Sequence, residues 1–385
     1  MPILQPEYEV LADSIKSLVA RLDEYLEPYY RHFGRKENHE HARMYVAGRT
    51  ARMNRRTLEP IATANGVPRR PLQTFVGAGL WSDDEVRSQL VEQIATEIGS
   101  PHGVLIFDAS GFQKWGKKSV GVKRQWCGRL GKVENCQVGE FLGYATPHGH
   151  TLVDCRLYLP QEWAKDKTRR AAAHIPKEIK FLKGWELAYE MHQRQASALP
   201  HEWTVGDDAY GRIPELRDRL DFDGEPYLLE VPSGTIVRKN GMGPPRSIAQ
   251  IADSLPGKLW TTVRLRDGEK GPIEVRAIKL RVTAGKNNTK ENRRRETLLI
   301  LRRPKTGERW NYLSNRKGVS VQTMAKAAAC RHYIEQSLQE GKGQVGLAQY
   351  EVRSWVGWHH HMTLAMLALH FLVREKYRLK KRPRR

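Results

Sequence analysis

The segment Gly103-Val104-Leu105-Ile106-Phe107-Asp108-Ala109-Ser110-Gly111 decides the fold. Its run of apolar residues, followed at once by turn-forming residues, predicts a short buried strand that stops at Asp108. The pattern returns in Glu202-Trp203-Thr204-Val205-Gly206, which is followed by Asp207 and Asp208. Open α/β sheets carry functional groups at the carboxyl ends of their strands, so Asp108 and Asp207 are candidates for chemistry. Each is also the kind of residue that begins a turn or caps a helix.

The elements around these two strands predict an α/β fold. Residues 1 to about 95 keep a helical period of ~3.6. Next come antiparallel strands, separated by Gly-rich or Pro-His-Gly turns, and then two helices: 119–126, 136–145, 151–159, 176–198 and near 211–220. A β-rich block follows from about 222 to 305, with candidate strands at 226–231, 259–265, 273–282 and 297–303 and a basic loop at 285–295. Helices return at about 321–341 and 357–378.

Charge is the most unusual property of the composition. The chain has 385 residues, with 65 Lys and Arg against 43 Asp and Glu, a formal net charge of +22. At about 150 residues per domain, this length allows roughly two to three domains. A surface of this sign attracts polyanions, so nucleic acid is the first partner to consider. Residues 374–385 hold eight Lys or Arg and predict a disordered, phosphate-binding tail.

Several other classes of protein are disfavoured. Four Cys without a C-x-x-C pair indicate a reducing, cytoplasmic compartment rather than a disulfide scaffold. The most apolar run, 362–373, is 12 residues long, short of the ~20 residues needed to cross a membrane. Neither G-x-x-x-x-G-K-[ST] nor G-x-S-x-G occurs, which leaves ATP use and serine hydrolysis unsupported. The run 359–361 is three His that cannot all face one ion from a helix, and His148 and His150 with Cys155 leave a weak zinc option.

Two carboxylates, each at the end of a short strand, favour a hard divalent cation such as Mg²⁺, because these ions prefer oxygen ligands. A third group is offered by the helix expected at 321–341, where Arg331, Glu335 and Lys342 are spaced by four and seven residues. At ~100° per residue, they share one stripe if the helix runs one residue further. This stripe fits a metal ligand beside phosphate-contacting cations. It also fits a solvated helix with an i,i+4 salt bridge.

Three stretches of the chain resemble the DDE transposases of bacterial insertion sequences, in the cut-and-paste subgroup with a Tyr-Arg-Glu-Lys signature. The stretches are Ile106 to Lys114, Val205 to Gly211 and Arg331 to Trp358. The third is the most specific. The family signature is Tyr, two residues, Arg, three residues, Glu, six residues, Lys, and the chain has Arg331-x₃-Glu335-x₆-Lys342 at that spacing. One position departs from the signature, because Ala328 stands where the family has Tyr.

The resemblance covers about 104–375 and implies a fold. It implies an RNase H-like catalytic core with a β-rich insertion, preceded by an all-helical N-terminal domain. The implied divisions are a helical DNA-binding domain, a catalytic domain in two pieces, an insertion and a basic C-terminal tail: 1–98, 99–221 with 306–373, 222–305, and 374–385.

The same resemblance implies a metal-dependent endonuclease and strand transferase that binds the ends of a mobile element, cleaves phosphodiester bonds and joins the 3′-OH ends to target DNA. By this resemblance, Asp108, Asp207 and Glu335 are the catalytic, metal-binding triad. The triad holds two Mg²⁺ ions, for which Mn²⁺ can substitute. Arg331 and Lys342 become contacts to the DNA backbone. The implied partners are double-stranded DNA and a second copy of the chain, as a homodimer on paired ends in the bacterial nucleoid.

Alternatives remain for the acids and for the function. Asp208 is a rival to Asp207, although in the family that the chain resembles the acid sits three residues before a Tyr-Gly pair, and Tyr210-Gly211 then selects Asp207. Glu351 is a rival to Glu335 but lacks the flanking Arg and Lys. Asp154 lies inside an expected strand and is interpreted as structural. A protein of another class, a non-catalytic or domesticated DNA-binding protein, would use the basic charge without the acids.

Overall fold

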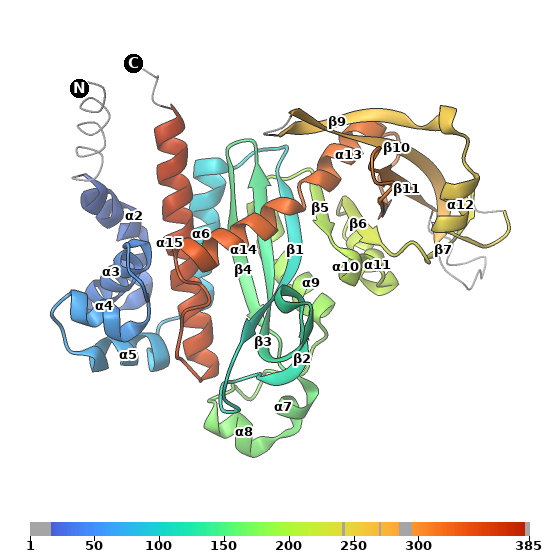
Figure 1. The fold of residues 1–385 in the computed structure, drawn as a ribbon. Helices are drawn as coiled ribbons and strands as arrows, with labels where there is room; N and C mark the ends of the chain where they lie inside the picture. The colour runs from blue at the N-terminus through green and yellow to red at the C-terminus, as the bar shows by residue number, and fades with distance from the viewer. Residues whose placement is uncertain (1–16, 241–242, 269–270, 285–294, 382–385) are drawn as a thin grey trace.

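The fold is organised around a mixed sheet of twelve strands (Figure 1). We describe it from a computed structural model that covers residues 17–240, 243–268, 271–284 and 295–381. The strands pair in the order β2-β3-β1-β5-β6-β12-β11-β10-β7-β8, with β4 also paired to β3 and β9 to β10. The chain is therefore a mixed α/β protein, as the sequence predicts.

The centre of the sheet is built from the strands expected on either side of Asp108. They are β1 (Val104–Gln113), β2 (Lys123–Cys127), β3 (Lys132–Thr146), β4 (Gly149–Leu157), β5 (Trp203–Gly206) and β6 (Tyr227–Val231). The strand β3 is antiparallel to β1, β2 and β4, which confirms the expected pairing. The strand β5 is parallel to β1, with Gly206 opposite Phe107. The carboxyl end of β5 thus lies beside Asp108 in β1.

The β-rich block continues the same sheet. It contains strands and one helix: β7 (Ile236–Lys239), β8 (Arg246–Ser247), α12 (Ile248–Ser254), β9 (Thr261–Gly268), β10 (Gly271–Ala284), β11 (Arg295–Arg302) and β12 (Arg309–Ser314). The strand β6, expected inside this block, pairs in parallel with β5 and antiparallel with β12. It therefore joins the two parts edge to edge. Positions 285–294 of the expected basic loop lie outside the described residues.

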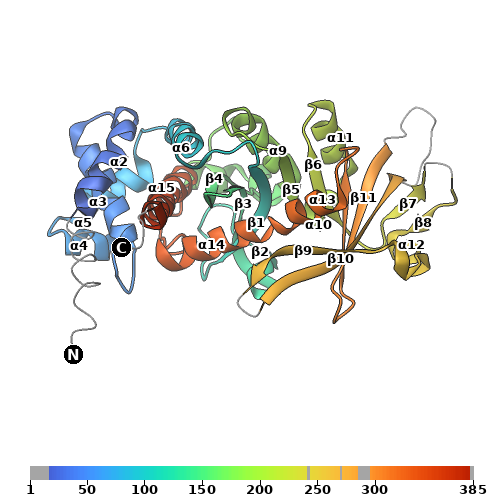
Figure 2. The same cartoon turned by 90° about the horizontal axis from the view of Figure 1, so that it is seen from above.

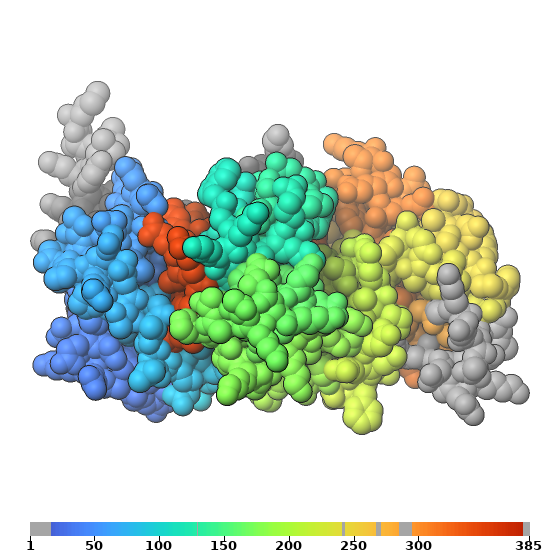
Figure 3. Space-filling view, turned by 90° about the horizontal axis from the view of Figure 1, so that it is seen from below, coloured from blue at the N-terminus to red at the C-terminus, as the bar shows by residue number. Residues whose placement is uncertain are grey.

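Helices α2 (Leu18–Phe33), α3 (Lys36–Thr50), α4 (Leu58–Ala64), α5 (Arg69–Ala78) and α6 (Asp83–Ile98) precede β1. Of these, α3, α5 and α6 pack against α15 (Trp355–Lys381), which also packs against β4, while α2 packs on α3 and α6 and α4 packs on α3 and α5. The Tyr25 hydroxyl of α2 also reaches α15 and donates to the Leu367 carbonyl at 2.9 Å. Figure 3 shows the orange-red C-terminal segments between the blue N-terminal helices and the green centre of the molecule.

Further helices cover both sides of the central strands (Figure 2). They are α7 (Gln161–Lys165), α8 (Lys167–Ala172), α9 (Gly184–Gln195), α10 (Asp208–Gly211), α11 (Pro214–Phe222), α13 (Val321–Ala329) and α14 (His332–Gln344). In the view from above, α9 and α11 lie on one side of β1 and β5, and α13 and α14 on the other. This layering leaves the carboxyl ends of β1 and β5 facing α14.

Three expectations about helices and a strand are wrong in detail. The helix expected at 321–341 is two helices, because the chain leaves α13 at Cys330 and restarts as α14. The helix expected at 176–198 begins only at Gly184, and the strand expected from 119 begins at Lys123. The segment from 374, expected to be a disordered tail, continues α15 as far as Lys381. Within this segment, Arg374 pairs with Glu97 at 3.6 Å. Residues 382–385 lie outside the described part of the chain.

Candidate active site

A cleft of about 1320 Å³ opens where β1, α10 and α14 meet. The five residues that the sequence singles out for chemistry all line it: Asp108, Asp207, Arg331, Glu335 and Lys342. The rival acid Asp208 lines it as well. The structure therefore brings these residues together around one cleft. Their elements are separated by up to about two hundred residues of chain, so the folding of the sheet creates the site.

Asp108 stands in β1, one position beyond the pair formed by Phe107 and Gly206. Its carboxylate Oδ1 accepts a hydrogen bond of 2.9 Å from the backbone N–H of Ala109. Burial and the charge of Asp207 raise the pKa of Asp108 to about 7, against the opposing effect of Arg331. A carboxyl group with this pKa is poised to lose its proton when a cation arrives.

Asp207 follows β5 and caps α10. Its Oδ1 accepts from the Ala209 N–H at 3.0 Å, so the capping role and the position in the cleft belong to the same side chain. Burial raises the pKa of Asp207, with a further contribution from the charge of Asp208. Asp208 is also in the cleft lining, but its Oδ2 is held by Arg212 at 2.5 Å.

Glu335 lies in the first turn of α14 and is the most exposed of the three acids, with a side chain 53% accessible. The Arg331 guanidinium reaches it at 2.9 Å (Nη1 to Oε1). Arg331 also faces Glu230 of β6 at 3.6 Å, so it lies among several carboxylates. The i,i+4 salt bridge between Arg331 and Glu335, which their spacing in the sequence allows, is therefore present in the structure.

Lys342 lies on the same helix, because α14 extends to Gln344. Its ammonium group donates to the hydroxyl of Ser110 in β1 at 2.6 Å and lies 5.3 Å from the centre of the Phe112 ring. This contact joins the far end of α14 to the strand that carries Asp108. The lysine therefore borders the cleft on the side of β1.

Glu140 and Tyr210 form a layer behind the acids that the sequence did not reveal. Glu140 of β3 is opposite Ala109, and its Oε2 accepts from the Tyr210 hydroxyl at 2.5 Å. Burial and the charges of Asp108 and Asp207 raise the pKa of Glu140 to about 7. Next to Tyr210, a Cβ on Gly211 would lie 1.8 Å from the Glu230 carbonyl oxygen, so this position accepts only glycine. The Tyr-Gly pair is the one sequence signal for this layer.

Trp126 is a second residue that sequence reasoning missed. It lies in β2, lines the cleft and is 62% exposed. A large, exposed aromatic ring at the edge of a polar cleft is available to stack against a base, as aromatic side chains do in nucleic-acid complexes. In the sequence, Trp126 is distinguished only by its position in a predicted strand that mixes polar and apolar residues.

The rival acids lie elsewhere. Glu351 is exposed and pairs with Arg55 of the N-terminal helices at 3.0 Å. Asp154 is fully buried in β4 and faces Arg87 of α6 at 3.0 Å, in agreement with its structural interpretation. Ala328, which stands at the signature Tyr position, is buried in α13. No helix in the described ranges is both long and apolar enough to cross a membrane.

Comparison with known proteins gives two matches. The sequence profile of the family described as DDE superfamily endonuclease matches residues 28–272, more than half of the chain. A probable transposase for insertion sequence element IS701, from Microchaete diplosiphon, is 30% identical over 132 residues. That alignment spans 33% of this chain and 35% of the relative, about a third of each. By the extent of the profile match, the chain belongs to the DDE superfamily endonuclease family.

Proposed function

We propose that this protein is the transposase of an insertion sequence, which cleaves phosphodiester bonds at the ends of a mobile element and joins the 3′-OH ends to target DNA. The observation that carries the proposal is the convergence of Asp108, Asp207 and Glu335 from two strands and a helix on one cleft. The family and the similarity to the IS701 transposase support it. The net charge of +22 suits a polyanionic substrate.

The residues of the cleft fit a divalent metal. Three carboxylates supply hard oxygen ligands, and burial beside Asp207 leaves Asp108 with a pKa of about 7. Such a group is stabilised in its charged form by a nearby cation. Asp108, Asp207 and Glu335 would hold two Mg²⁺ or Mn²⁺ ions, which when bound supply activation of the attacking oxygen and stabilisation of the leaving oxygen.

The protein's own groups would perform the remaining tasks. In the cleavage step, a water oxygen bonds to phosphorus and the bond from phosphorus to the 3′ oxygen breaks, leaving a 3′-OH and a 5′-phosphate. In the joining step, that 3′ oxygen bonds to a target phosphorus and displaces a 3′ oxygen of the target strand. Both steps need in-line positioning and neutralised charge rather than a covalent intermediate. Lys342, which lines the same cleft beside Ser110, is placed to orient the phosphate.

Arg331 would have a different role from the simple backbone contact that the resemblance implies. Its guanidinium is engaged by Glu335 at 2.9 Å and Glu230 at 3.6 Å. A DNA phosphate would compete with these carboxylates for its five N–H donors. We therefore assign Arg331 first to holding Glu335 in place and second to the DNA.

The architecture would serve the same reaction. We assign the strands β1 to β5 and β12, with α13, α14 and most of α15, to an RNase H-like catalytic core, residues 99–221 and 306–373. The block 222–305 is then an insertion, and the helices within 1–98 a DNA-binding domain. Two copies on paired element ends would form the active homodimer, in the bacterial nucleoid.

The test is metal-dependent cleavage of a labelled duplex that carries the element end. We expect Asp108→Asn, Asp207→Asn and Glu335→Gln each to lose at least a thousandfold in cleavage rate while retaining binding of the same duplex. Asp208→Asn and Glu351→Gln are the matched controls, since one is an acid in the same cleft and the other an acid outside it. Both controls should keep cleavage within about tenfold of the wild type.

Two outcomes would contradict the proposal. A wild-type protein that binds the duplex but leaves it intact with Mg²⁺ and with Mn²⁺ would indicate a non-catalytic DNA-binding protein. Loss of cleavage in Asp208→Asn with full activity in Asp207→Asn would move the catalytic role to the neighbouring acid.

A further inference from the structure

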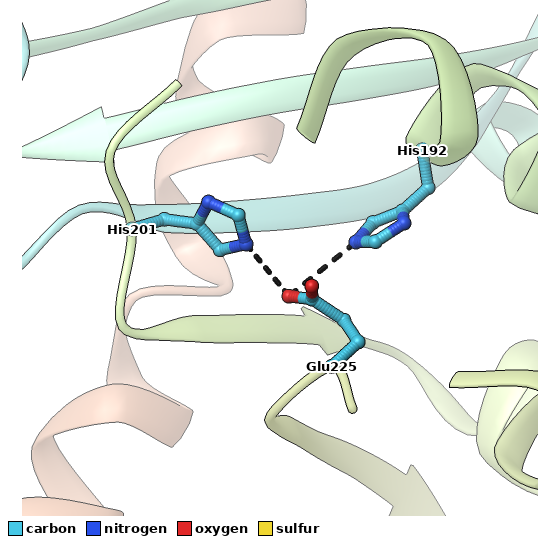
Figure 4. A group of neighbouring side chains, drawn as sticks. All are labelled: His192, His201 and Glu225. Carbon is cyan, nitrogen blue, oxygen red and sulfur yellow. Dashed lines mark hydrogen bonds and ion pairs between the residues drawn. The ribbon is translucent and has the colours of Figure 1, made fainter. Parts of the chain in front are cut away.

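A second cluster of metal-binding side chains lies at the opposite end of β5 from Asp207. His192 stands in the last turn of α9, His201 precedes β5, and Glu225 lies between α11 and β6. Figure 4 shows both imidazole rings turned toward the Glu225 carboxylate. At about 3.3 Å per residue, the length of the strand separates this cluster from the catalytic acids by on the order of 15 Å.

The spacing of the three side chains suits one ion. The Nε2 atoms of His201 and His192 lie 2.6 Å and 3.5 Å from the same oxygen, Oε1 of Glu225. Of the described His, Cys, Asp and Glu side chains, this is the group of three whose ligand atoms all lie within 4.8 Å of one another. Ligands at about 2.0–2.2 Å from a tetrahedral zinc ion are roughly 3.3 Å apart. A small opening of the contact between His201 and Glu225 would admit the ion.

The hydrogen bonds of His201 require a positive charge between its ring and the Glu225 carboxylate. Its Nδ1 lies 2.6 Å from the Leu199 carbonyl oxygen, to which it can only donate. If Nδ1 carries the proton of a neutral ring, Nε2 presents a lone pair to the carboxylate oxygen at 2.6 Å. A second proton must then lie between them at this distance, and a metal ion takes the place of that proton once the two atoms separate to about 3.3 Å. Donation of the other ring N–H to a carbonyl is the usual arrangement of a metal-bound histidine.

The surroundings of the cluster orient its ligands. The buried Thr204 hydroxyl of β5 donates to Glu225 Oε1 at 3.0 Å and lies 3.1 Å from His192 Nε2. The Asn315 side-chain amide donates to the Glu225 carbonyl at 2.8 Å. His192 is 2% exposed and its Nδ1 has no hydrogen-bond partner in the described residues. Because the Thr204 hydroxyl gives its proton to Glu225, its oxygen accepts from His192 Nε2, and binding of an ion at Nε2 would move that ring proton to Nδ1.

We propose that His192, His201 and Glu225 bind one Zn²⁺ ion, with water as the fourth ligand. Two imidazoles and one carboxylate suit zinc, whereas Mg²⁺ prefers oxygen ligands alone. The side chains of His201 and Glu225 are 10% and 14% exposed, which gives the ion and the water access. The site joins α9 to the starts of β5 and β6. Asp207 directly follows β5, and β6 is the strand paired with β5. It does not depend on the proposed transposase activity.

The experiment measures Zn²⁺ binding to the full chain in a background that lacks the catalytic acids, Asp108→Asn, Asp207→Asn and Glu335→Gln. Chelator-treated protein is titrated with Zn²⁺ against a chromophoric chelator, and its melting temperature is followed with Zn²⁺ and with Mg²⁺. We expect one tightly bound Zn²⁺ per chain and a rise in melting temperature that Mg²⁺ does not produce. Co²⁺ in place of Zn²⁺ should give the visible absorption of a four-coordinate site.

Three substitutions in the same background locate the site. His201→Gln and Glu225→Gln should each weaken Zn²⁺ binding by more than a hundredfold and abolish the Zn²⁺-dependent rise in melting temperature. Thr204→Val, which keeps the ligands and removes the orienting hydroxyl, should weaken binding by about 10–100-fold. His102→Gln is the control, since His102 also faces a carboxylate, Glu202 at 3.2 Å, but on the surface.

The readout separates a metal site from an ion pair. Loss of an ion pair would lower the melting temperature of Glu225→Gln without metal and leave the Zn²⁺ response unchanged. Unchanged Zn²⁺ affinity in both His201→Gln and Glu225→Gln, or no Zn²⁺ response in the parent background, would overturn the proposal.

Discussion

Asp108 and Asp207 could be found from the sequence because each follows a short apolar strand, and the register of β1 and β5 does bring these strand ends together. Glu335 is identified through the resemblance of its flanking Arg and Lys to the family signature, because their spacing alone also fits an i,i+4 salt bridge. Glu140 and Glu230 could not be found in this way. They enter the site through pairing of β3 with β1 and of β6 with β5, contacts that no local pattern encodes.

At the level of the single residue, the raised pKa of Asp108 makes a prediction about stability. Between its ordinary value of 3.8 and about 7, the folded protein holds a proton that the unfolded chain has released. Stability therefore falls as pH rises through this range, and the loss is complete above about pH 7. Asp108→Asn should raise the melting temperature at pH 8 without divalent ions, and should change it little at pH 4.

Melting curves of the two proteins at pH 4, 6 and 8 check this expectation. The measurement at pH 4 is the internal control, because both forms of position 108 are then largely uncharged in the folded state. An equal shift at all three pH values would mean that the substitution acts through packing rather than through charge.

At the level of the element, the division between α13 and α14 was not predictable from helical period alone. The sequence around Cys330 is compatible with a continuous helix, but α13 packs against β9 and β10 while α14 packs against β1, β3 and β4. Two different surfaces require two helix axes. The break places Arg331 at the start of α14, where it reaches both Glu335 and Glu230.

This position of Arg331 predicts a link between α14 and divalent ions. Removing its charge in Arg331→Ala leaves the acids of the cleft without their nearest cation. We expect a melting temperature lower by about 2 °C or more without metal. The rise produced by Mg²⁺ should be larger than in the wild type, because the ion then relieves more repulsion.

Arg212→Ala is the matched control, since Arg212 lines the same cleft but pairs with Asp208 rather than with Glu335. Its response to Mg²⁺ should equal that of the wild type. A smaller Mg²⁺ response in Arg331→Ala than in the wild type would show that the arginine supports the ligands without substituting for the ion.

At the level of the whole molecule, the N-terminal helices are tied to the sheet by buried charge. Arg87 of α6 is 1% exposed and faces the fully buried Asp154 at 3.0 Å, and Arg156 lies 3.1 Å from the same oxygen. Asp154→Ala would leave Arg87 with Asp83 and Asp84, and Arg156 with Asp84, and should cost up to about 3–5 kcal/mol. Glu59→Ala, which removes an exposed pair with Arg69 at 3.4 Å, should cost about 0–1 kcal/mol.

Chemical unfolding of the two variants measures the difference. Equal losses would mean that the acid in β4 contributes no more than a surface ion pair. The sequence identified Asp154 as structural from its place in a strand, but its partner is 67 positions earlier in the chain and only the fold reveals it.

The packing of the first helices around α15 has a consequence for synthesis of the protein. Because α15 is synthesised after every other described helix and strand, the N-terminal helices leave the ribosome before the segment that covers their apolar faces. A chain that terminates before Trp355 has lost this central helix and cannot complete its core. Unfinished copies are thus expected to become substrates for proteases instead of folded, inactive competitors of the full-length protein.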